Sequence, residues 1–104
     1  MSIVVLSCAF FSLGLYGVLT RRDLVALLAS AEVMLGGATL LLVTLMTERV
    51  GASAGALEAA RGSAVAVVLL AIVAAEAAVG LAIVIAVFRT RGTLNVDEVT
   101  LLKN

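Results

Sequence analysis

The stretch SAVAVVLLAIVAAEAAVGLAIVIAVF, residues 63–88, is almost entirely apolar and carries a single charged residue, Glu76. A helix needs about 20 apolar residues to cross a hydrocarbon core about 30 Å thick, and this stretch is longer than that. Backbone groups in lipid must form their hydrogen bonds within their own segment, so the stretch predicts a transmembrane helix.

Two further runs have the same character. Residues 2–20 carry no charged side chain, and residues 24–47 carry only Glu32. Hydrophobic residues make up 63% of the chain, whereas roughly half is usual in soluble domains. We therefore expect an all-α membrane protein that forms one three-helix transmembrane domain, residues 1–104. Its expected parts are spans at about 2–20, 24–47 and 63–88 and a C-terminal tail at 89–104.

The basic residues set the expected orientation. With three spans, the first loop and the C-terminal tail lie on one side of the membrane, and the N-terminus and the second loop on the other. The first side carries Arg21, Arg22, Arg89, Arg91 and Lys103, and the second carries only Arg49 and Arg61. Because basic residues accumulate on the cytoplasmic side, we expect the N-terminus outside and the C-terminus in the cytoplasm.

The connections differ in length. Residues 21–23 form a very short first connection, which predicts a tight antiparallel hairpin of the first two helices. Residues 48–61 contain several small residues and are expected to form a flexible external loop. The end of the tail either docks a short segment on a neighbour or frays, as chain termini often do.

Glu32 and Glu76 are the main candidate functional residues. A carboxylate at membrane depth is costly, and its presence is a functional hypothesis by default. At a rise of 1.5 Å per residue, Glu32 lies roughly 12 Å from Leu24 and Glu76 about 18 Å from Phe88, so both fall in the middle third of the bilayer. An unpaired anion in hydrocarbon takes up a proton instead, so we expect each group to be neutral in isolation. Each would then exchange protons when a neighbouring charge changes.

The surroundings of the two glutamates favour this interpretation. Small residues, which let membrane helices approach closely, are frequent around both. Thr39 falls two turns beyond Glu32 on the same face, where its hydroxyl could hold a water. We therefore predict that Glu32 and Glu76 are catalytic as a proton relay. The alternative is that each stays protonated and only pins helices together. Arg21 and Arg22 are either part of the site or simple topology anchors.

Composition excludes several kinds of site. The chain has no histidine and one cysteine, Cys8, whereas zinc, haem and iron–sulfur centres need several such ligands. Its formal net charge is zero, so it lacks the basic footprint of a nucleic-acid-binding protein. We expect no metal, cofactor or nucleic acid to be bound by this chain.

Several segments resemble one family. Arg-Arg-Asp-Leu at 21–24 and Ala-Glu-Val-Met at 31–34 are similar to the first loop and second helix of the K subunit of proton-pumping NADH–quinone oxidoreductase. This enzyme is respiratory complex I, and the mitochondrial form of the subunit is called 4L. The sequence AAEAAVGLA at 74–82 is similar to the third-helix motif of that family, and LNVD at 94–97 to its C-terminus.

The resemblance implies a non-redox membrane-arm subunit of an enzyme that translocates protons while electrons pass from NADH to quinone. Its partners would be the other membrane-arm subunits and the lipid bilayer, and FMN, iron–sulfur clusters, NADH and the quinone would bind to other subunits. Glutamates that match Glu32 and Glu76 belong to the proton pathway of that family, and arginines that match Arg21 and Arg22 are implicated in its activity. The scarcity of lysine beside abundant Ala, Val, Gly and Arg favours a bacterial plasma membrane.

Other functions remain open on the residues alone. The nearest are a homologous small subunit of a membrane-bound hydrogenase or of a cation/proton antiporter complex, and a purely structural helix-packing subunit. A proton-coupled exporter of aromatic cations would favour Trp and Tyr in its pocket, but the chain has no Trp and only Tyr16. A rotor-ring subunit suits a two-helix hairpin with one carboxylate.

Overall fold

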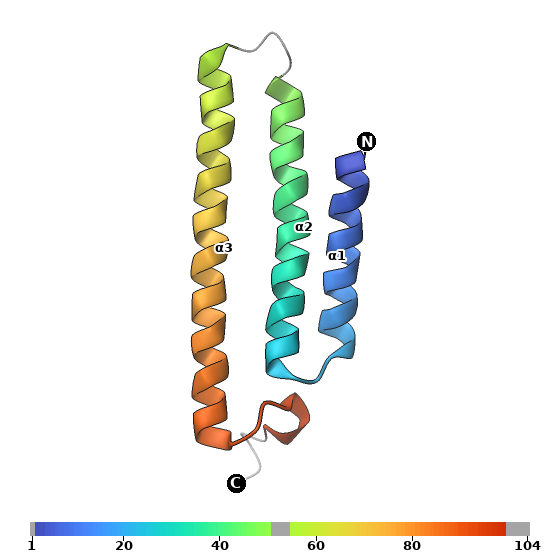
Figure 1. The fold of residues 1–104 in the computed structure, drawn as a ribbon, viewed down its shortest axis with the longest axis vertical. Coiled ribbons are helices and arrows are strands. Elements are labelled where there is room, and N and C mark those ends of the chain that lie inside the picture. The colour runs from blue at the N-terminus through green and yellow to red at the C-terminus, as the bar shows by residue number, and fades with distance from the viewer. Residues whose placement is uncertain (1, 51–54, 100–104) are drawn as a thin grey trace.

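A computed structural model describes residues 2–50 and 55–99 of the chain. Its elements are the helices α1 (Ser2–Thr20), α2 (Leu24–Val50) and α3 (Ala56–Arg91) and one short turn of 3₁₀ helix, η1 (Val96–Glu98). Figure 1 shows the three long helices side by side in one layer, with α2 between α1 and α3. All three are long and apolar enough to cross a membrane, so the predicted all-α membrane fold is confirmed. The orientation of the chain in the membrane stays a prediction.

Local signals set where the helices begin and end. α2 begins after Asp23, whose carboxylate accepts a hydrogen bond from the Ala26 N–H at 3.0 Å, as acidic residues commonly do when they cap a helix N-terminus. α3 ends at Arg91 and is followed by Gly92, which has φ 71° and ψ 6° and donates its N–H to the Phe88 carbonyl. Glycine adopts this left-handed conformation without steric cost, so the chain can leave the helix there.

The helices extend past the apolar runs. α2 continues to Val50 and α3 begins at Ala56, so most of the expected loop at 48–61 is helical, while 51–54 lie outside the described residues. Glu58 and Arg61 form an ion pair of 2.8 Å in the first turns of α3. With 36 residues, α3 is about 54 Å long at 1.5 Å per residue. This length exceeds the lipid core, so charged turns project from it, and the limits of the spans and of the tail stay predictions.

Glycines bring α1 and α2 close together. A β-carbon on Gly37 of α2 would stand 2.7 Å from the Phe11 nitrogen and 2.8 Å from the Ser7 oxygen of α1. A β-carbon on Gly14 of α1 would likewise meet the backbone of Ser30 and Met34. Small residues at such positions allow membrane helices to pack backbone against backbone. α1 and α2 therefore form the tight hairpin that the short first connection predicted.

The third helix covers α2 with one stripe of side chains. Residues of α3 that are half-buried or buried recur every three or four positions, which is the spacing of one helix face; they are Gly62, Ala66, Leu69, Val73, Ala77, Gly80, Val84 and Val87. Val84 is the one buried apolar side chain among the residues whose burial the structure describes. A single layer of helices encloses no core, and most of its apolar surface is left for lipid or other proteins to cover.

Candidate functional site

Contact between Leu28 of α2 and Gly80 of α3 marks the register of these two helices. A β-carbon on Gly80 would stand 2.5 Å from Leu28 Cδ1, so the leucine side chain occupies the space that the glycine leaves free. The helices run antiparallel, as Figure 1 shows. Glu32 lies four residues after Leu28, and Glu76 lies four residues before Gly80. Equal steps of one turn from the contact therefore place the two carboxylates at one level of the layer.

The two glutamates differ in exposure. Glu32, on the helix that is flanked on both sides, is half-buried, whereas Glu76 is exposed. Glu76 stands beside the stripe with which α3 covers α2, since its neighbour Ala77 is half-buried. In the described part of the chain, neither carboxylate has a hydrogen-bond or ion-pair partner.

A threonine near Glu32 also has a free hydroxyl. Ser30, Thr44 and Thr47 of α2 donate their hydroxyls to backbone carbonyls of the same helix at 2.7–2.8 Å. Among the described side chains of α2, only the Thr39 hydroxyl has no such bond. Thr39 lies two turns from Glu32, and residues at this spacing share a helix face. Its hydroxyl is available to a water molecule on the side of α2 that carries the carboxylate.

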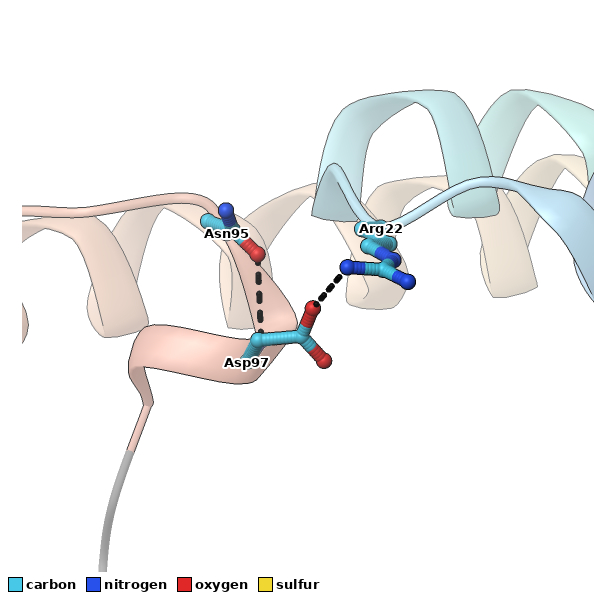
Figure 2. Close-up of polar contacts among 3 residues, drawn as sticks. All are labelled: Arg22, Asn95 and Asp97. Atoms are coloured by element: carbon cyan, nitrogen blue, oxygen red, sulfur yellow. Dashed lines mark hydrogen bonds and ion pairs between the residues drawn. The ribbon is translucent and has the colours of Figure 1, made fainter.

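The loop arginines lie apart from the glutamates. Arg21 is exposed and lines a small groove between α1 and α2 together with Tyr16 and Ser30. Arg22 extends toward the C-terminal segment, and its Nη1 lies 3.0 Å from Asp97 Oδ2 (Figure 2). The level of Glu32 is roughly 12 Å further along α2 from Leu24. The structure thus brings the two glutamates to one level and places both arginines at the end of the layer. The catalytic roles predicted for these four residues stay predictions.

The C-terminal segment folds back on the first loop, a contact that the sequence did not reveal. The Val96 N–H donates to the Arg22 carbonyl at 2.7 Å, and the Leu24 N–H donates to the Leu94 carbonyl at 2.9 Å. Asn95 Oδ1 accepts the Asp97 N–H at 3.1 Å, as drawn in Figure 2. The described part of the tail therefore docks on its own chain. An Asn two residues before an Asp is a local turn signal, but no local pattern shows that Arg22 is the partner.

The chemistry available here is proton exchange. The described residues contain no group of three or more His, Cys, Asp or Glu that could hold a metal ion. The carboxyl groups of Glu32 and Glu76 and the hydroxyl of Thr39 are the polar groups of α2 and α3 that lie near this level without a partner in the described chain. These features describe a class of protein: a small multi-pass membrane protein with two acidic side chains in its apolar helices.

Comparison with known proteins identifies the family. The model of the family NADH-ubiquinone/plastoquinone oxidoreductase chain 4L matches residues 2–104. The NADH-quinone oxidoreductase subunit K of Anaeromyxobacter sp. (strain K) is 45% identical over 97 residues, 93% of this chain and 90% of the relative. The protein of the same name from Roseiflexus castenholzii is 41% identical over 100 residues, 96% and 92% of the two chains. That from Desulfitobacterium hafniense is 38% identical over 102 residues, 98% and 92%.

The chain therefore belongs to the chain 4L family of NADH–quinone oxidoreductases, as the motifs at 21–34 and 74–82 predicted. It is a multi-pass membrane subunit of that family.

Proposed function

We propose that this chain is a membrane-arm subunit of a proton-translocating NADH–quinone oxidoreductase in a bacterial plasma membrane, and that Glu32 and Glu76 form a proton relay in it. Its partners are the other subunits of the complex, and the C-terminus faces the cytoplasm. Electron transfer through FMN and iron–sulfur clusters takes place on those subunits. One observation carries the proposal: the register marked by the Leu28–Gly80 contact places both carboxylates at one level, and neither has a partner on the described chain.

The exposure of Glu76 supports assembly with other subunits. An ionisable group at mid-span almost always faces protein or a water-filled cavity, because exposure to lipid is costly. Glu76 is exposed on a layer that has no second layer of its own. A partner subunit that covers this face supplies the polar surroundings that Glu76 lacks. If that partner also moves a basic group toward Glu76, it changes the charge that governs proton release.

The relay follows from this arrangement. Packed helices lie about 8–10 Å apart, so one or two waters span the distance between carboxyl groups at one level. A positive charge that approaches Glu76 stabilises its ionised form, and the proton passes into this water. Glu32, when ionised, takes up a proton from the same water and is neutralised. Thr39 offers the next hydroxyl along α2, and the proton that Glu32 later releases leaves through water held there.

Replacing Glu76 by glutamine tests the proposal. Glu76→Gln keeps the size and a hydrogen-bonding group but cannot release a proton. We expect the complex to assemble and its pumping rate to fall at least about tenfold, since positioned proton-transfer groups contribute about 10²–10⁴-fold. The measurement is acidification of inverted membrane vesicles after addition of NADH, normalised to the assembled complex on a native gel.

Glu58→Gln is the matched control. Glu58 lies in the first turn of the same helix and forms only an exposed ion pair with Arg61, an interaction that contributes little to stability. We expect this variant to pump at the normal rate. If Glu76→Gln also pumps normally in a fully assembled complex, Glu76 is a helix-packing residue and the relay is wrong.

A further inference from the structure

The contact between α2 and α3 leaves the position of α3 along α2 weakly determined. In the α1–α2 hairpin, a β-carbon on Gly14 or Gly37 would collide with backbone atoms, so these helices interlock. At Gly80, the nearest atom is the flexible end of the Leu28 side chain. In lipid there is no hydrophobic driving force between apolar helices. The stripe on α3 therefore holds α2 less firmly than the glycines hold α1 against α2.

A slip of this kind would separate the candidate relay groups. One turn of α-helix is about 5.4 Å. If α3 moved by one turn, Glu76 would leave the level of Glu32 by that distance, and a water bridge between the two carboxyl groups would be lost. A contact outside the stripe that resists this slip would keep the two carboxyl groups at one level.

The segment after α3 supplies polar contacts with defined geometry. Gly92 turns the chain at the end of α3, and residues 93–99 then lie against the first loop. Asp23 and Asn95 form an antiparallel bridge, flanked by the hydrogen bonds from Val96 to Arg22 and from Leu24 to Leu94. The Leu24 N–H belongs to the first turn of α2, where no helix carbonyl is available to it. We call this segment, residues 92–99, the clasp.

The parts of the clasp differ in importance. The Arg22–Asp97 ion pair is 77% and 58% exposed at its two side chains, and exposed pairs contribute little on their own. The two backbone hydrogen bonds are therefore the main attachment, and the ion pair orients η1 against the loop (Figure 2). Arg22 has its side chain committed to this contact and lies away from both glutamates.

We infer that the clasp fixes α3 in register on α2, and that Arg22, Asp97 and the Val96 N–H position Glu76 opposite Glu32. The register itself does not depend on the proposed function. Its importance for pumping rests on that function, because the level of Glu76 matters if the two carboxyl groups exchange protons. Arg22 is then a positioning residue and not a member of the relay.

Val96→Pro removes the central hydrogen bond with little other change. Proline lacks the N–H that Val96 donates to Arg22, and it is tolerated at the first position of a helix such as η1. The residue before a proline must be extended, and Asn95 already has φ −77° and ψ 120°. Val96→Ala keeps the N–H and is the matched control.

Disulfide cross-linking in the assembled complex reports the register without reference to activity. In a Cys8→Ser background, Leu28→Cys with Gly80→Cys traps the register of the structure, and Leu28→Cys with Val84→Cys traps a slip of one turn. We expect Val96→Pro to lower the first cross-link at least about threefold and to raise the second. Val96→Ala should leave both unchanged. An unchanged pattern in the Val96→Pro complex would overturn the inference.

Exchanging the charges of the ion pair provides a second test. It decides the question even where the Val96→Pro complex does not assemble. We expect Arg22→Asp and Asp97→Arg each to lower the Leu28–Gly80 cross-link by up to about fivefold, within the range of an exposed pair, and the double variant to restore it. Arg21→Asp, next in sequence and without an ion pair in the described chain, should have no effect. Failure of the double variant to restore the cross-link would contradict the positioning role.

These readouts separate the inference from the proposed function. Loss of register in the clasp variants, together with normal pumping by Glu76→Gln, would support the clasp and refute the relay. Normal register in the clasp variants, together with loss of pumping in Glu76→Gln, would do the reverse.

Discussion

Leu28 of α2 fills the space that the missing β-carbon of Gly80 leaves on α3. Its Cδ1 lies 2.5 Å from where that β-carbon would stand. This one contact relates the two glutamates, because each lies a single turn from it in the same direction along the layer. Glycine is required at position 80 because it has no β-carbon, and not because its backbone is flexible. It admits the Leu28 side chain, whose contact marks the common level of Glu32 and Glu76.

Gly37→Ala should disrupt the α1–α2 hairpin. The new methyl group would stand 2.7–2.8 Å from backbone atoms of Phe11 and Ser7, which can yield only if the helices separate. We expect the folded subunit to be destabilised by about 1–3 kcal/mol, the usual cost of overpacking. It should be measured as a lower thermal midpoint of the solubilised complex and less subunit on native gels. Gly36→Ala is the neighbouring control, because a β-carbon there would meet nothing within 4 Å. Equal effects of the two changes would contradict the packing described here.

Asp23→Ala should loosen the start of α2. The Asp23 carboxylate accepts the Ala26 N–H at 3.0 Å, and loss of such a cap costs about 1 kcal/mol. Amide hydrogen exchange in the first turn of α2 should become about fivefold faster, since 1.36 kcal/mol corresponds to a factor of ten. Asp23→Asn retains an acceptor oxygen and should exchange at nearly the normal rate. Faster exchange in both variants would mean that charge, and not the cap, holds this turn.

Thr39→Val should slow pumping without affecting assembly. Valine has nearly the shape of threonine but cannot hold a water for Glu32. We expect a two- to tenfold lower pumping rate, the equivalent of one hydrogen bond of about 0.5–1.5 kcal/mol. Thr44→Val is the control, because the Thr44 hydroxyl already donates to the Leu40 carbonyl at 2.8 Å. A normal rate for Thr39→Val would remove this hydroxyl from the pathway.

Glu32→Gln and Glu76→Gln should not be independent. If the two groups act in one relay, the double variant pumps more slowly than either single variant, but its loss is well short of the product of the two single losses. Independent sites would give losses that add in the logarithm of the rate. Vesicle acidification by all four proteins, at equal amounts of assembled complex, distinguishes the two results.

Much of this fold is predictable from the sequence because lipid allows few solutions. The apolar runs at 2–20 and 24–47 predict helices, and the structure has α1 and α2 there. The prediction of a loop at 48–61 is wrong for residues 48–50 and 56–61, because helix continues through the charged turns that contain Glu48 and Glu58.

The site was predictable in kind but not in arrangement. Glu32 and Glu76 are visible in the sequence as lone acids in apolar runs, and their depth follows from counting residues. Their common level depends on which side chain meets Gly80, and this is a property of packing between two helices. The pairing of Arg22 with Asp97 joins opposite ends of the chain. A single sequence contains no local pattern for such a contact.

Infrared difference spectra of the complex during turnover test the central claim most directly, because protonated and ionised carboxyl groups absorb at different frequencies. In the parent complex we expect carboxyl bands that change during turnover. Glu32→Gln should remove one part of this signal and Glu76→Gln another part. If the carboxyl region is the same in all three proteins, both glutamates keep one protonation state throughout the cycle and cannot relay protons.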